Sequence, residues 1–271
     1  MARRVIPGFG LSFGITVAAL TAVILVPLAA LFLKAAGLGP AQSWEILRTP
    51  RVAAAFRLTF GASALAAATA AGFGLLVVWV LVRYRFPGRR LLDAMVDLPF
   101  ALPTAVAGIT LAELYGPNGW IGEKLALIGV QGAYSPVGVF IALTFISFPF
   151  VVRTVQPVLE DLQPEFEEAA ATLGAARFTT VRRVIFPALV PALVTGFTLA
   201  FARAIGEYGS VVFISGNLPF KTEILPILII GQLEQFNYAG ASVIAAAMLI
   251  VSFSLLLVIN LLQRRLVARI H

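Results

Sequence analysis

The stretch that decides the fold is Glu168-Ala169-Ala170, followed by Gly174 and then by Val184-Ile185-Phe186-Pro187. It lies in residues 157–187, a charged segment between two apolar runs that are each long enough to cross a membrane. Five acidic residues open this segment and three arginines close it. Acidic side chains favour the start of a helix, as Pro164 also does, and glycine permits a sharp turn. The segment therefore predicts a solvent-facing helical hairpin.

The composition of the whole chain indicates a membrane protein. Of its 271 residues, 60% are hydrophobic and 12% are charged, which is more apolar surface than one water-soluble globule can bury. The formal charge of +7 comes from basic residues placed between apolar runs, so it indicates orientation in a bilayer and not nucleic-acid binding. With no cysteine, disulfides and cysteine-ligated metal sites are excluded, and we expect no metal site.

Stretches free of charge predict about six transmembrane helices, at 10–34, 57–82, 94–115, 136–157, 188–214 and 240–263. The first is too long for the apolar core of a signal peptide, so it is expected to remain as a span. The third is interrupted by Pro99, Pro103 and Gly108. An arrangement of five spans with a re-entrant third segment therefore stays open.

The distribution of lysine and arginine predicts the orientation of these spans. Thirteen of the twenty cations, including Arg3 and Arg4, fall on one side and six on the other, while Arg203 lies within a span. Because cations accumulate on the cytoplasmic side, both termini and the Glu168 segment are expected there. We expect one all-α membrane domain, residues 1–271, with residues 157–187 as a cytoplasmic loop.

The spacing within this loop resembles a known signature. Glu-Ala-Ala, three residues, glycine, nine residues and then an aliphatic-x-apolar-proline group is similar to the permeases of binding-protein-dependent ATP-binding cassette (ABC) importers. Val184 stands where that family usually has isoleucine and Phe186 where it has leucine, and both keep an apolar side chain. The resemblance implies the type I ABC importer permease fold.

The same resemblance implies that the loop couples this chain to a cytoplasmic ATPase. Its short helix would sit in a cleft of the ATPase, and the implied coupling residues are Glu168, Ala169, Ala170, Gly174 and Pro187. No G-x-x-x-x-G-K-[ST] loop occurs in the chain. ATP and magnesium are therefore expected on two copies of a separate ATPase, and this subunit is expected to be non-catalytic with no cofactor of its own.

Four further blocks resemble the permeases of sulfate/thiosulfate importers, and most closely their T (or U) subunits. These blocks are Arg83–Arg89, Asp97–Gly108, Phe148–Glu160 and Arg203–Gly209. The likeness implies import across the bacterial cytoplasmic membrane, a second, similar permease in a heterodimer, and an extracytoplasmic sulfate/thiosulfate-binding protein. Molybdate and tungstate permeases share the Arg-x-x-Gly-Glu-aromatic-Gly block, so a molybdate/tungstate importer remains the alternative.

Candidate residues of the translocation path follow from charge inside the spans. Arg203 lies about 22 Å into its span if that helix begins near Ala188. A cation at this depth is expected to face protein or a water-filled path, and Glu207, four residues on, can pair with it. A guanidinium that is partly neutralised could attract a dianion without trapping it. A purely structural Arg203–Glu207 pair stays open as the alternative.

Prolines in the spans supply weaker candidates for the same path. Pro99 and Pro103 disturb backbone hydrogen bonding, and Thr104 offers a hydroxyl group beside them. Ser147, two residues before Pro149, has a similar setting. A kink that only helps helices to pack is the alternative in each case.

Two other classes of membrane protein have a similar composition and number of spans. An intramembrane serine protease is excluded because the only histidine, His271, is the last residue, and no catalytic residues are expected. An ATP-independent anion transporter or channel is compatible with the composition and the span count. Such a protein has no need of a hairpin that docks an ATPase.

Overall fold

The computed structural model describes residues 9–163 and 165–270, and this part of the chain is helical with no strand. Expectations that rest on Arg3, Arg4, Pro164 and His271 lie outside the described residues. Five helices of the described residues are long and apolar enough to cross a membrane, at Phe9–Ala36, Pro50–Arg83, Pro136–Glu160, Arg177–Ile205 and Tyr238–Arg265. The chain is therefore a multi-pass all-α membrane protein, as predicted.

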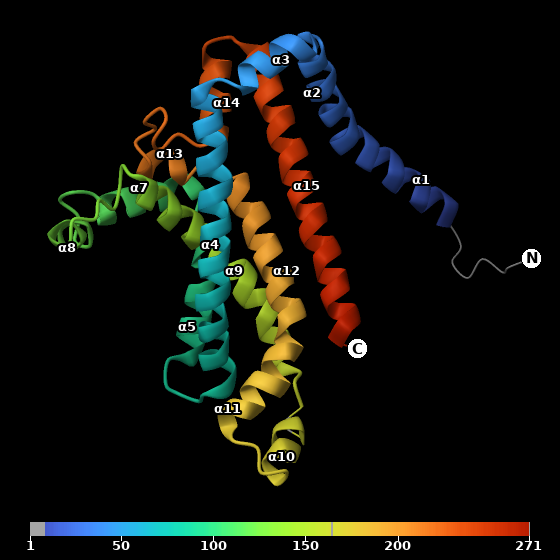
Figure 1. The fold of residues 1–271 in the computed structure, drawn as a ribbon, viewed down its shortest axis with the longest axis vertical. Helices are drawn as coiled ribbons and strands as arrows, with labels where there is room; N and C mark the ends of the chain where they lie inside the picture. Colours follow the sequence, from blue (N-terminus) through green and yellow to red (C-terminus); the bar gives the residue numbers. More distant parts are fainter. Residues whose placement is uncertain (1–8, 164, 271) are drawn as a thin grey trace, which may run out of the picture.

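The centre of the molecule is a bundle of three helices, α4 (Pro50–Arg83), α9 (Pro136–Glu160) and α12 (Phe186–Ile205), which lie side by side (Figure 1). Glycines bring the outer two against α9. A Cβ on Gly74 would stand 2.9 Å from Val151 Cγ1, and a Cβ on Gly196 would stand 3.1 Å from Val151 Cα. Small residues at these positions permit the close approach that stabilises membrane helices by dispersion.

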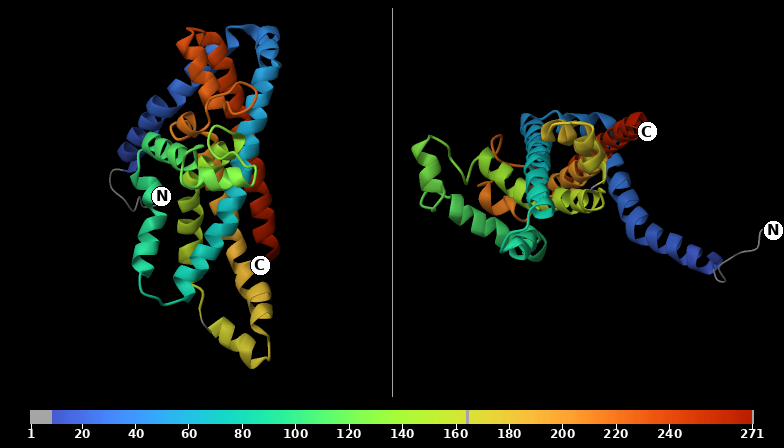
Figure 2. Two further views of the ribbon diagram at one scale, coloured as in Figure 1. Left: turned by 90° about the vertical axis from the view of Figure 1, so that its left-hand side faces the viewer. Right: turned by 90° about the horizontal axis from the view of Figure 1, so that it is seen from below.

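The first helix of the described residues leaves this bundle. α1 (Phe9–Leu20), a π-helical turn η1 (Thr21–Leu25) and α2 (Val26–Ala36) form one continuous helix, and none of the α1 residues is buried. Its far end meets α3 (Gly39–Leu47) and α15 (Tyr238–Ile270), and from there it diverges from the bundle (Figure 1 and the right-hand view of Figure 2). α14 (Leu225–Glu234) packs beside α15 and α4.

The predicted third span, 94–115, is wrong as a single helix. The chain forms α5 (Arg89–Val96), α6 (Leu98–Ala101) and α7 (Thr104–Tyr115) instead. Leu102 is extended because the following Pro103 disfavours a helical conformation before it. α7 and α8 (Gly122–Leu127) then run to one side of the bundle (Figure 1). Whether this broken segment spans the membrane or re-enters it, which decides between six spans and five, stays a prediction.

The predicted fifth span, 188–214, is also wrong at both ends. α11 (Arg177–Thr180), a π-helical turn η2 (Val181–Ile185) and α12 form one continuous helix that starts before the span and ends at Ile205. The wide π-turn ends two residues before Pro187, and η1 ends likewise two residues before Pro27. Proline has no N–H to donate, so a local change in hydrogen bonding accommodates it inside the helix. Pro187 therefore lies inside this helix and not at its start.

Candidate functional site

The loop with the Glu-Ala-Ala sequence is a helical hairpin, as its composition predicts. α10 (Glu165–Thr172) carries three glutamates in its first turn, and Glu168 and Ala169 are exposed while Ala170 is buried. Gly174 ends the helix with φ of 75°. The N–H of Ala175 donates to Ala170 O at 3.0 Å and that of Gly174 to Ala171 O at 2.9 Å. This pair of bonds is a Schellman motif, which favours glycine because its φ is positive.

An ion pair joins this hairpin to the central bundle. Arg83 Nη2, at the end of α4, lies 2.5 Å from Glu167 Oε1 on α10. Phe166, Leu173 and Phe178 are 53%, 87% and 74% exposed around the same hairpin. Exposed apolar side chains on a charged hairpin are typical of a surface that another protein covers. Glu168 thus projects beside apolar groups, with its neighbour Glu167 held by the bundle.

The Arg203–Glu207 pair exists, but it does not lie within one helix. α12 ends at Ile205, so Glu207 is in the turn that follows, which corrects the prediction that both residues occupy one span. Arg203 Nη1 and Glu207 Oε2 are 2.5 Å apart, with side-chain exposures of 32% and 2%. The other oxygen of Glu207 accepts from the N–H and the hydroxyl of Ser210, each at 2.9 Å. Glu207 therefore stabilises the turn through its bonds to Ser210, while the Arg203 side chain remains partly exposed.

The start of α7 packs directly on this turn. A Cβ on Gly209 would stand 2.2 Å from Thr104 Oγ1, and a Cβ on Gly108 would stand 2.4 Å from Ser210 O. Two sequence blocks that lie about a hundred residues apart, Asp97–Gly108 and Arg203–Gly209, thus meet in one place. Thr104 is half-buried there and lies against Gly209, two residues after Glu207.

The other predicted path residues have different surroundings. Pro103 precedes α7 and is exposed, whereas Pro99 is buried in α6, which packs on α9. Ser147 is fully buried in α9, and its hydroxyl donates to Leu143 O at 2.6 Å. The structure brings Thr104 to the turn that contains Glu207 and Gly209, and it leaves the Ser147 hydroxyl bonded within its own helix.

Comparison with known proteins identifies the family of this chain. Residues 64–271 match the family described as "Binding-protein-dependent transport system inner membrane component". The chain belongs to this family. It is 50% identical to the Escherichia coli (strain K12) protein named "Sulfate transport system permease protein CysT", over 97% of this chain and 95% of that one. The protein of the same name in Synechocystis is 53% identical over 92% of this chain and 87% of its own length.

Solved structures confirm the fold of this permease. A chain of the bacterial alginate ABC transporter, solved with an alginate pentasaccharide-bound periplasmic protein, superposes with a TM-score of 0.77 over 95% of this chain and 94% of its own length at 17% identity. A chain of the MetNI methionine ABC transporter gives a TM-score of 0.57 over 80% of this chain and 94% of its own length at 20% identity. The predicted type I ABC importer permease fold is thereby confirmed.

A polar cluster that the sequence did not reveal connects the Asp97–Gly108 block to a third block, Phe148–Glu160. Arg153 on α9 donates to both carboxylate oxygens of Asp97 at 2.8 and 2.6 Å, and to Asp93 Oδ1 at 2.7 Å. It also donates to Gln156 Oε1 and to the carbonyl oxygen of Asp93. Asp97 and Arg153 are noticeable in the sequence because they interrupt charge-free stretches. No local pattern indicates that they pair across 56 positions.

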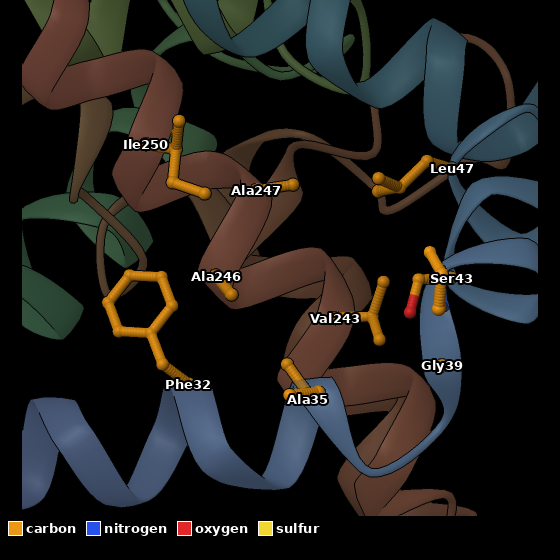
Figure 3. Close-up of a pocket in the computed structure, with 11 residues that line it drawn as sticks. Phe32, Ala35, Gly39, Ser43, Leu47, Val243, Ala246, Ala247 and Ile250 are labelled. Carbon is orange, nitrogen blue, oxygen red and sulfur yellow. The ribbon is translucent and has the colours of Figure 1, made fainter.

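The apolar pocket at the end of α2 does not compete with the Arg203–Glu207 turn as a site for an anion. The pocket between α2, α3 and α15 has a volume of about 380 Å³ and is lined by apolar side chains with Ser43 as the single hydroxyl among them (Figure 3). No charged side chain lines it, so it cannot offset the hydration lost by a dianion. No group of three or more potential metal ligands occurs in the range the structure describes.

Proposed function

We propose that this chain is the T-type permease subunit of an ATP-driven importer that moves sulfate or thiosulfate across the bacterial cytoplasmic membrane. The observation that carries the proposal is the identity of about one half, over nine tenths of the chain, to relatives named as sulfate transport permeases. No comparable observation favours molybdate. Both ends of the chain, including the end of α15, would lie on the cytoplasmic side with the 157–187 hairpin.

In this proposal the hairpin couples the permease to its ATPase, within one membrane domain of residues 1–271. Exposed Glu168 and Ala169 would contact the ATPase, Ala170 and Gly174 would fix the end of α10, and Pro187 would lie in the helix that carries the movement to the membrane. The support is the Schellman turn and the exposed Leu173 beside it. Two ATPase copies would bind ATP and magnesium, so this subunit is non-catalytic.

The proposed translocation path passes the Arg203–Glu207 turn. Arg203 is 32% exposed while its carboxylate partner is 2% exposed, so one face of the guanidinium remains open to a dianion. Thr104 and the N-terminal N–H groups of α7 face the same turn and add donors where an anion is favoured. Pro103 leaves this helix end uncapped by a side chain, whereas Pro99 and Ser147 would shape the path only through packing.

The remaining partners follow from the assembly of such importers. A second, similar permease would form a heterodimer with this chain, and an extracytoplasmic sulfate/thiosulfate-binding protein would deliver the anion. Support comes from the alginate transporter, whose structure includes a periplasmic protein, and from the unburied helix α1, which nothing in this chain covers within the described residues.

The decisive experiment is uptake of radiolabelled sulfate by proteoliposomes that contain this chain, its neighbouring permease, the ATPase and the binding protein. We expect uptake that requires ATP and is competed by thiosulfate but not by molybdate. Efficient competition by molybdate would replace sulfate with the molybdate/tungstate assignment. Uptake without the ATPase would instead identify a secondary transporter or a channel.

A further inference from the structure

An apolar groove with a cationic end lies between α4 and the continuous helix of η2 and α12. Its volume is about 260 Å³, and it is lined by Leu75, Leu76 and Trp79 from α4 and by Val181, Ile185, Phe186 and Leu189 from η2 and α12. Leu76 is 62% exposed and Phe186 is 46% exposed, so the groove opens to the outside of the bundle. Its lining contains no ionisable side chain.

Three arginines lie within one helical turn of the residues that line one end of this groove. Arg83 follows Trp79 by one helical turn, and its guanidinium carbon lies 5.8 Å from the centre of the Trp79 ring. Arg182 precedes Phe186 by one turn, on the same face of the helix. Arg183 is the next residue after Arg182, and both arginine side chains are exposed. Glu167 neutralises Arg83 in part. Arg182 and Arg183 have no ion-pair partner among the described side chains, and they supply the charge at this end.

We propose that this groove binds an anionic phospholipid of the cytoplasmic leaflet, with one acyl chain along the groove and the phosphate group against Arg182 and Arg183. An apolar groove on the outside of a membrane-spanning bundle favours hydrocarbon over water. Arginines at its end attract the phosphate of an anionic lipid, and they form stronger paired hydrogen bonds with phosphate than a lysine would. The ring of Trp79 lies between the apolar lining and Arg83, and indole rings are favoured at such a boundary between hydrocarbon and headgroups.

This site has a consequence for the hairpin, because the groove lies at its base. Its walls are α4, which carries Arg83, and the helix that leaves the hairpin at Arg177. A lipid in the groove would contact both walls and hold the hairpin against the bundle. The inference concerns lipid binding alone and does not depend on which solute is carried.

Fluorescence of Trp79 tests the proposal in the full-length chain. Trp44→Phe and Trp120→Phe leave Trp79 as the single tryptophan, and the protein is reconstituted in phosphatidylcholine with increasing fractions of brominated phosphatidylglycerol or brominated phosphatidylcholine. We expect phosphatidylglycerol to quench Trp79 severalfold more effectively than phosphatidylcholine. Equal quenching by the two lipids, or quenching by neither, would overturn the proposal.

Charge variants and salt separate a headgroup site from general attraction. Arg182→Gln with Arg183→Gln should remove the severalfold preference for phosphatidylglycerol, because one arginine near an anionic lipid contributes up to about fivefold at low salt. The matched control is Arg264→Gln with Arg265→Gln, because Gln263 of α15 contacts α12 at Pro191, on the face opposite to Leu189. It should leave the preference unchanged. In the protein that keeps all its arginines, raising the salt to 0.5 M should weaken the preference for phosphatidylglycerol. If both double variants lowered this preference equally, a specific site at Arg182 and Arg183 would be refuted.

Discussion

Gly108 on α7 is in backbone contact with Ser210, in the turn after α12: a Cβ on Gly108 would stand 2.4 Å from the Ser210 carbonyl oxygen. The obstacle is main chain, which cannot move aside as a flexible side chain does. We predict that Gly108→Ala separates α7 from this turn and destabilises the permease, because overpacking at such contacts typically costs about 1–3 kcal/mol. Thermal unfolding of the detergent-purified chain measures the effect as a lowered midpoint.

A matched glycine serves as the control for this prediction. Gly61 lies in α4, and a Cβ there would meet nothing within 4 Å. Gly61→Ala should leave the midpoint unchanged or raise it slightly, because alanine favours a helix more than glycine does. Equal midpoints for the two variants would show that α7 and the turn are not tightly packed.

The Arg203–Glu207 pair allows the path role to be separated from a structural one. Arg203→Ala should lower sulfate uptake at least tenfold while the ATPase still co-purifies with the permease. Glu207→Ala should impair assembly as well, because it leaves the Ser210 N–H and Arg203 without their acceptor, and such losses cost about 1–3 kcal/mol for a buried donor. Glu207→Gln keeps an acceptor for Ser210 and should restore assembly. Failure of Arg203→Ala to assemble would favour the structural pair.

Local patterns in the sequence predicted more of this structure than distant pairings did. The hairpin followed from charge order and Gly174, both of which act within a few residues. Pro99 and Pro103 correctly marked the disturbed third segment, but composition could not show that its pieces turn sideways. The helix end at Ile205 was missed because the apolar residues 211–214 were joined to the span across Gly206–Ser210, although the glycines at 206 and 209 are local turn signals. The Arg153–Asp97 pairing needs two elements to meet, which no local pattern specifies.

A double-mutant cycle on Arg153 and Asp97 measures this missed contact. Both side chains are partly exposed, at 31% and 47%, so the paired hydrogen bonds should couple them by only about 1 kcal/mol. Arg153→Lys should lose most of this coupling, since lysine cannot form both bonds at once. Urea unfolding in detergent gives the four free energies of unfolding. Zero coupling would mean that the Asp97 bonds do not help to hold this segment against α9, and would leave the Asp93 contacts of Arg153 and apolar packing to do so.

The hairpin gives the sharpest prediction about coupling, because its glycine and its glutamate act through different physics. Glu168 is exposed, so Glu168→Arg should leave the chain folded and inserted but remove ATPase binding and uptake. Co-purification of the ATPase, with a thermal midpoint as a check on folding, measures both effects. Full uptake by this variant would count against a docking role for α10.

Gly174 has φ of 75°, where a β-branched residue is strongly disfavoured. Gly174→Val should therefore unwind the end of α10, displace the exposed Leu173 and abolish ATP-dependent uptake while membrane insertion is retained. Gly174→Asn is the matched control, because asparagine tolerates this left-handed conformation far better and its side chain is similar in size to valine. It should keep a substantial part of the uptake. If asparagine and valine were equally harmful, bulk at the ATPase contact and not backbone conformation would be the reason for glycine; normal uptake by the valine variant would contradict coupling through this turn.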